Sequence, residues 1–141
     1  QIAPHNLTLE VTESLAINDM ERMKEILNSI KALGVRIALD DFGTGYSSLN
    51  HIREIPFDVI KVDQTFIKDL ERDSYAKSFI RMVAELAEAI DVNLCVEGVE
   101  TMIQYEILSE MKVNLVQGYY FDRPMPKEDF EKKYTPLLGE R

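Results

Sequence analysis

The chain has 141 residues, of which 45% are hydrophobic and 29% charged, and its formal net charge is -9 at pH 7. This composition predicts one globular unit with enough apolar side chains for a core, and it argues against disorder. The negative charge argues against binding of polymeric DNA or RNA, which depends on Lys and Arg at many phosphates. A nucleotide ligand would need metal ions as mediators.

The chain shows no sign of an internal disulfide, a membrane span or a signal peptide, and these three observations suggest its cellular compartment. Its single cysteine, Cys95, lies between Leu94 and Val96, which predicts a buried strand position and excludes an internal disulfide. No apolar run approaches the ~20 residues of a membrane span, and no signal peptide is recognisable. We therefore expect a cytoplasmic chain, or the cytoplasmic part of a membrane-attached signalling protein. Because it begins at Gln1, we also expect it to be a piece of something longer.

Short apolar runs alternate with longer amphipathic stretches, the pattern of βα units around a parallel sheet. The expected strands are 7–11, 36–40, 58–62, 93–97 and 114–118. The expected helices are 18–33, 48–55, 74–90, 101–111 and 126–134. Asn18 or Asp19 would cap the first helix and Gly34 would end it, while Pro126 would begin the last one.

Such alternation fits either a doubly wound sheet or a barrel. Polar residues near the carboxyl ends of the runs favour the barrel, because (β/α)₈ active sites lie at that rim. They are Glu10, Asp40, Asp41, Lys61, Asp63, Glu97 and Gln117. We predict an α/β, TIM-barrel-like fold. A complete barrel takes about 250 residues and eight strands, so about five βα units predict a partial barrel with its N-terminal units before Gln1.

Four carboxylates would meet at this rim, those of Glu10, Asp40, Asp41 and Glu97. Their repulsion predicts divalent cations, since Mg²⁺ and Mn²⁺ prefer oxygen ligands and two such metals stabilise both oxygens of a phosphodiester displacement. Asp40 can point into the barrel mouth and Asp41 can join it from the turn that follows. Lys61 would hold a nucleophilic water or a phosphate oxygen there.

Each of these residues also has a purely structural interpretation. Glu10 alone fits a solvated strand edge, Asp40 with Asp41 fits a helix N-cap, and Lys61 fits an ion-pair partner of Asp40 or Glu97. Asp63 and Gln117 could satisfy backbone groups at strand ends. Because such residues recur at the end of strand after strand, a functional site at the rim is favoured over these separate structural interpretations.

Five segments resemble, in order and spacing, the motifs of EAL domains, the bacterial cyclic di-GMP phosphodiesterases. They are LEVTES (9–14), DDFGTGYSS (40–48), FDVIKVD (57–63), CVEGVET (95–101) and QGYYFDRPMP (117–126). The resemblance implies that residues 1–141 are the C-terminal portion of a single EAL domain, a modified TIM barrel. It implies hydrolysis of cyclic di-GMP to linear pGpG at a two-metal site that uses Mg²⁺ or Mn²⁺ and is inhibited by Ca²⁺.

The resemblance also assigns roles to residues. Glu10, Asp40 and Asp41 would be metal ligands, with Asp40 shared between the metals. Lys61 would lie near the attacking water, and Glu97 would be the general base or a water-mediated ligand. Further residues beside the substrate or these groups would be Glu13, which steadies the loop after the aspartate pair, and Asp63, Glu100 and Gln117.

The sequence departs from the family pattern as well. The Glu-Ala-Leu motif itself, the arginine after it and an asparagine ligand are expected upstream of Gln1, so this fragment alone is expected to be inactive. Asp122 stands where a small residue is common, and it would either disfavour a nearby phosphate or face solvent. The alternative function is a non-catalytic cyclic di-GMP receptor or protein-interaction module. A homodimer and fused sensory or regulatory domains are also implied.

Overall fold

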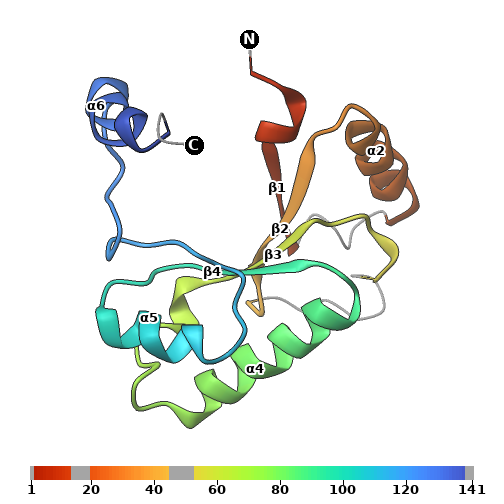
Figure 1. Cartoon of the computed structure of the whole chain (residues 1–141). Coiled ribbons are helices and arrows are strands. Elements are labelled where there is room, and N and C mark those ends of the chain that lie inside the picture. Colours follow the sequence, from red (N-terminus) through yellow and green to blue (C-terminus); the bar gives the residue numbers. More distant parts are fainter. Residues whose placement is uncertain (1, 14–19, 45–52, 139–141) are drawn as a thin grey trace.

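The computed structural model describes residues 2–13, 20–44 and 53–138. Its strands form one parallel sheet in chain order (Figure 1). They are β1 (Thr8–Thr12), β2 (Arg36–Phe42), β3 (Val59–Val62), β4 (Asn93–Val96) and β5 (Leu115–Val116). All five predicted strands are present with shifted ends. The predicted caps Asn18 and Asp19, and most of the predicted helix 48–55, lie outside the described residues.

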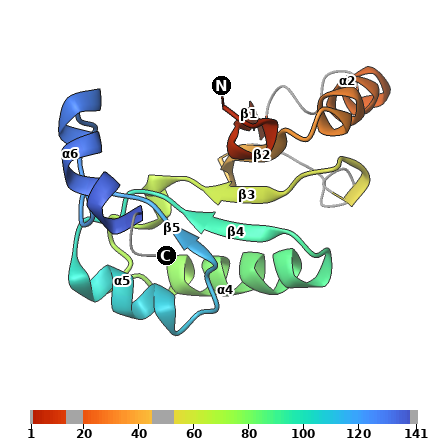
Figure 2. The ribbon, with the colours of Figure 1, turned by 45° about the horizontal axis from the view of Figure 1, so that its top comes forward.

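Helices connect three of the four pairs of successive strands, as the alternating sequence pattern predicts: α2 (Met20–Ala32) lies between β1 and β2, α4 (Ser74–Ala89) between β3 and β4, and α5 (Met102–Ser109) between β4 and β5. Helix α6 (Lys127–Leu138) follows β5, and η1 (Pro4–Asn6) and η2 (Gln64–Phe66) are short 3-10 turns. Half of the β2–β3 connection, residues 45–52, lies outside the described residues. Figure 2 shows α4 and α5 together beneath one face of the sheet. This arrangement is an arc of a (β/α) barrel, which confirms the predicted fold class. No helix in the described ranges is long and apolar enough to cross a membrane.

Helix α4 supplies much of the core. The side chain of Asp73 caps it by accepting a hydrogen bond of 2.8 Å from the Tyr75 amide. Its buried residues recur at helical spacing, as an amphipathic helix requires: Ala76, Ile80, Val83, Ala84 and Ala87. They share one core with strand residues that include Leu39, Ile60, Val62, Leu94 and Val96. Complete burial of one such Ile or Val side chain contributes roughly 1.5–3 kcal/mol.

The opposite face of the sheet carries smaller and polar side chains. Ala38, Val59 and Cys95 form a separate buried cluster there, and Lys61 lies beside Cys95 in the register of β3 and β4. Burial raises the pKa of the Cys95 thiol to about 11, so this cysteine is protonated at neutral pH, in line with the predicted buried strand position.

The last helix is longer than predicted. We expected it to end at Tyr134, but α6 continues through Pro136 to Leu138, although proline cannot donate a backbone hydrogen bond. Asp122 anchors this helix: it accepts a hydrogen bond of 2.6 Å from Lys133 and a second one from the Tyr134 hydroxyl. Asp122 therefore holds α6 against the segment that follows β5.

Candidate active site

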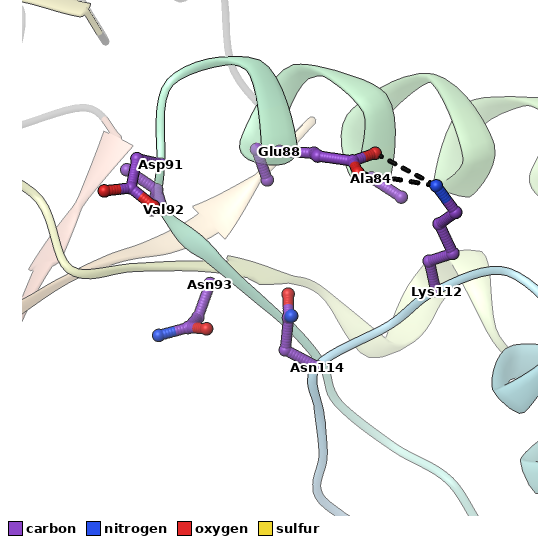
Figure 3. A pocket seen from close by; sticks show the side chains of 8 residues that line it. Ala84, Glu88, Asp91, Val92, Asn93, Lys112 and Asn114 are labelled. Atoms are coloured by element: carbon purple, nitrogen blue, oxygen red, sulfur yellow. Dashed lines mark hydrogen bonds and ion pairs between the residues drawn. The ribbon is translucent and has the colours of Figure 1, made fainter.

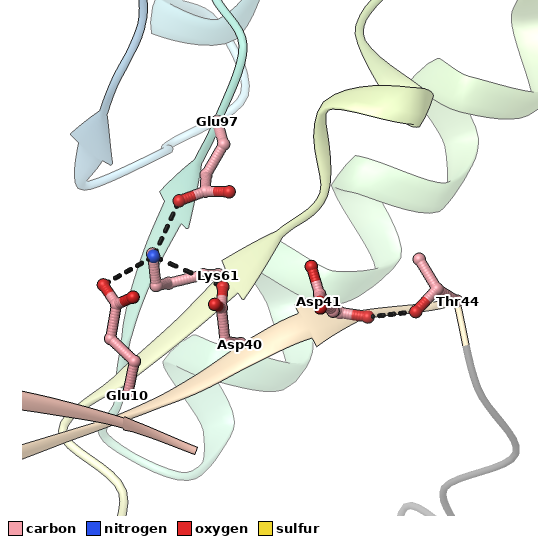
Figure 4. A network of polar contacts seen from close by, with 6 residues as sticks. All are labelled: Glu10, Asp40, Asp41, Thr44, Lys61 and Glu97. Atoms are coloured by element: carbon pink, nitrogen blue, oxygen red, sulfur yellow. Dashed lines mark hydrogen bonds and ion pairs between the residues drawn. The ribbon is translucent and has the colours of Figure 1, made fainter. Parts of the chain in front are cut away.

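Acidic side chains from β1, β2 and the end of β4 surround the ammonium group of Lys61 on β3 (Figure 4). The Lys61 Nζ atom lies 2.6 Å from Glu10 Oε1, 2.7 Å from Glu97 Oε1 and 3.3 Å from Asp40 Oδ1. Lys61 is only 6% exposed. The structure thus brings together four of the predicted site residues, Glu10, Asp40, Lys61 and Glu97. Two of them, Glu10 and Lys61, are 51 positions apart in the sequence.

The parallel register explains this convergence. Ala38 on β2 pairs with Glu10 on one side and with Val59 on the other, and paired residues of neighbouring strands point to the same face. Side chains alternate between the two faces along a strand. Asp40 and Lys61, each two residues after Ala38 and Val59, therefore lie on that same face and closer to the carboxyl rim. The polar residues therefore gather where the strands end.

A β-bulge positions Asp41 beside Asp40. The pairing of β2 with β3 shifts between Leu39 and Phe42, and Asp41 has a φ of 58°, in the left-handed region that non-glycine residues rarely adopt. Its carbonyl oxygen accepts bonds from the Thr44 amide at 3.2 Å and the Thr44 hydroxyl at 2.8 Å. The bulge allows two consecutive aspartates to lie at the rim while Phe42 returns to the core.

The electrostatics of the cluster depend on Lys61. Burial disfavours its charged form, but hydrogen bonds to Glu10 and Glu97 outweigh burial, and the pKa of Lys61 lies above its ordinary value. Burial and the nearby negative charge of Asp40 raise the pKa of Asp41. The carboxylates around Lys61 outnumber its single positive charge, so the cluster retains an excess of negative charge.

The donor chemistry of this cluster fits Mg²⁺ or Mn²⁺, which prefer carboxylate oxygens. Asp40 Oδ1 is buried and accepts no hydrogen bond of good geometry in the described structure, its contact being the 3.3 Å ion pair with Lys61, so a cation with better geometry can compete for it. In residues 2–13, 20–44 and 53–138, however, no three Asp, Glu, His or Cys side chains are arranged to hold a metal. The ammonium of Lys61 lies among the carboxylates instead.

Glu13 lies just beyond β1 and supports the turn after the aspartate pair. It is 3% exposed, and its Oε2 accepts a hydrogen bond of 3.2 Å from the Gly43 amide. On its other side Gly43 meets stacked aromatic rings, since a Cβ there would lie 2.5 Å from Phe79 and 3.1 Å from Phe66. The turn is thus held from two directions.

The remaining predicted residues lie around the cluster. Asp63 caps η2 by accepting a bond of 2.9 Å from the Thr65 amide. Glu100 and Gln117 line a cavity of about 200 Å³ together with Glu97. Gln64, which was not among the predicted site residues, lines the same cavity, and its Cβ lies against Gly98. Its position directly after the strand-end Asp63 is the signal that could have indicated it.

A larger cavity, of about 390 Å³, lies at the other end of the strands (Figure 3). Asn93, at the start of β4, and Asn114 line it, and Asn114 accepts a bond of 2.8 Å from the Leu94 amide. Glu88 and Lys112 form an ion pair of 3.4 Å beside it, but both side chains are exposed to solvent, where such pairs contribute little. The buried charges at the carboxyl rim make that end the better candidate site.

Comparison with known proteins identifies this arrangement. Residues 1–124 match the EAL domain family. The chain belongs to the EAL domain family. The candidate site therefore lies on an EAL domain arc, in which β1, β2, β3 and the residue directly after β4 supply the charged residues of the cluster.

Individual relatives support the same assignment. MucR of Pseudomonas aeruginosa, a bifunctional diguanylate cyclase/cyclic di-GMP phosphodiesterase, is 40% identical over 127 residues, or 90% of this chain and 18% of MucR. The complex of the PaMucR phosphodiesterase with c-di-GMP superposes with a TM-score of 0.87 at 40% identity, covering 92% of this chain and 52% of that one. A manganese and cy-diGMP complex of Klebsiella pneumoniae BlrP1 has a TM-score of 0.81 at 30% identity, covering 87% and 31%. This chain spans about half of the PaMucR structure.

Proposed function

We propose that the full-length protein carrying this chain hydrolyses cyclic di-GMP to linear pGpG at a two-metal site. The observation that carries the proposal is the convergence of Glu10, Asp40 and Glu97 on the buried Lys61 at the carboxyl rim of an EAL domain sheet. The activity named for MucR and the manganese complex of BlrP1 support it.

The residues have separate tasks in this proposal. Glu10, Asp40 and Asp41 would hold the Mg²⁺ or Mn²⁺ ions, which when bound would supply positive charge that stabilises the developing negative charge on the phosphodiester oxygens. Lys61 binds a phosphate oxygen or orients the attacking water, and Glu97 accepts a proton from that water. One P–O bond breaks, and the elements of water are added across it.

Metal identity tests this proposal in a hydrolysis assay of the full-length protein. Mg²⁺ and Mn²⁺ should support turnover, whereas Ca²⁺ should suppress it because it takes more ligands at longer distances. Asp40→Asn should lower the rate by roughly 100-fold, as loss of a metal ligand or its support commonly does. The control Asp69→Asn, in the exposed turn after η2, should leave the rate unchanged. Full turnover in excess chelator, or by Asp40→Asn, would contradict the two-metal proposal.

A further inference from the structure

The ammonium of Lys61 lies where the proposed metal ligands converge. We propose that Lys61 is an internal counter-ion, which occupies the carboxylate cluster in the metal-free protein and releases Glu10 and Asp40 when a divalent cation binds. The inference rests on the proposed metal-dependent function and extends it. Metal binding is then an exchange of one cation for another.

The contacts of Lys61 suit such an exchange. Its longest contact, 3.3 Å, is with Asp40, whose Oδ1 accepts no hydrogen bond in the described structure. The Glu10 side chain is 51% exposed, so it is the least buried of the three carboxylates that contact Lys61. Glu97, whose Oε1 lies 2.7 Å from Lys61 Nζ, directly follows β4. In the sheet, β4 lies on one side of β3, and β2 with Asp40 lies on the other side. Lys61 can therefore keep Glu97 as a partner while it leaves the other two carboxylates.

Charge explains why the metal-free cluster needs this lysine. Glu97 and Asp40 are about one-fifth exposed, at 22% and 20% of their side-chain surface, and partly buried like charges destabilise one another unless a cation lies between them. Lys61 supplies that cation. Its presence therefore stabilises the metal-free fold and, for the same reason, weakens metal binding by competition.

The test is a Mn²⁺ titration of the full-length protein and its Lys61→Met variant, by calorimetry and by electron paramagnetic resonance of free Mn²⁺. The variant should bind Mn²⁺ about tenfold more tightly or better, given the coupling energies of close charge pairs. In chelator its unfolding midpoint should fall, and Mn²⁺ should raise that midpoint further than in the unaltered protein. The matched control is Lys68→Met, which removes an exposed charge near Asp63 outside the cluster, and solvent screening should keep its effect on Mn²⁺ affinity below about twofold.

The outcomes separate this inference from the proposed function. Equal or weaker Mn²⁺ binding by Lys61→Met would overturn cation exchange and leave the metal-dependent reaction intact. Absence of Mn²⁺ binding in both proteins would overturn both proposals.

A variant that unfolds in chelator is informative as well. Adding Mn²⁺ should refold Lys61→Met, and a second substitution, Glu10→Gln, should restore its metal-free stability because it removes one of the uncompensated charges. If neither restores the fold, Lys61 acts through packing and the counter-ion role is wrong.

Discussion

The backbone amide of Gly43 donates a hydrogen bond of 3.2 Å to the carboxylate of Glu13. This bond links the end of β1, the strand that carries Glu10, to the turn that follows Asp40 and Asp41. The position of the aspartate pair therefore depends on a buried residue that has no place among the proposed ligands.

Glu13→Ala should lower the free energy of unfolding by about 1–3 kcal/mol, because it leaves the Gly43 amide without this acceptor. Glu13→Gln keeps an acceptor oxygen and should lose less. The control Glu85→Ala, on the exposed face of α4, should stay within about 0.5 kcal/mol. Urea unfolding measures all three, and equal stability of Glu13→Ala and Glu85→Ala would contradict a structural role for Glu13.

Gly118 follows Gln117 at the edge of the candidate site and has no room for a side chain. A Cβ there would lie 2.1 Å from the carbonyl oxygen of Val99, and backbone cannot move aside as a flexible side chain can. Gly118→Ala should therefore cost about 3 kcal/mol or more, at the upper end for overpacking.

Gly34→Ala is the comparison for Gly118→Ala. Gly34 has a φ of +86°, but its nearest neighbour would be the Cβ of Pro4 at 3.6 Å, so only backbone strain of about 1–2 kcal/mol is expected. Thermal unfolding should show the larger loss for Gly118→Ala, and the reverse order would contradict the close approach to Val99.

Asp63 should contribute stability that depends on pH. Burial opposes its charged form, but hydrogen bonds from Thr65 outweigh burial and hold the pKa of Asp63 below its ordinary value of 3.8. Because the folded-state pKa is the lower one, the contribution is present above the unfolded-state pKa and is lost as the pH falls through the folded-state pKa.

Asp63→Ala should therefore cost about 1 kcal/mol near neutral pH, the typical value for a lost cap. The difference from the unaltered protein should narrow below about pH 4. Asp63→Asn, which keeps an acceptor and does not titrate, should lie between the two proteins at neutral pH. Urea unfolding at several pH values checks this, and a difference that stays constant down to about pH 3 would exclude the titration of Asp63 as its cause.

Much of this fold follows from patterns that are local in the sequence. Apolar runs mark the strands, and polar residues such as Glu10 and Glu97 mark their carboxyl ends, because a parallel sheet aligns those ends at one rim. The geometry of the pair Asp40 and Asp41 could not be predicted from such local patterns. A bulge depends on how β2 pairs with β3, and pairing register is not encoded in one strand alone.

Long-range contacts explain the other differences. The sequence left Lys61 as a possible partner of Asp40 or Glu97, whereas in the structure it also pairs with Glu10 on β1. The sequence also gave no reason to extend the last helix through Pro136. Asp122 anchors that helix through Lys133, a contact between two segments that the pattern within the helix does not reveal.

The outer strands of the sheet predict self-association of the 141-residue chain. Leu9 on β1 and Leu115 on β5 are 41% and 48% exposed, and outer strands offer unpaired backbone groups to another chain. We expect a dimer in light scattering. Leu115→Lys, with an edge charge that opposes such pairing, should shift the chain toward monomer, whereas Lys112→Gln should not. A chain that stays monomeric at all accessible concentrations would contradict this prediction.

The most direct test of the proposed function compares binding and cleavage of cyclic di-GMP by the full-length protein and its Glu97→Gln variant in Mn²⁺. Glu97→Gln keeps the shape of the side chain and removes the proton acceptor, so cleavage should fall by roughly 100-fold or more, while calorimetry should show that binding survives. Binding of cyclic di-GMP by the unaltered protein without any cleavage in Mg²⁺ or Mn²⁺ would contradict the account and identify a receptor instead of a phosphodiesterase.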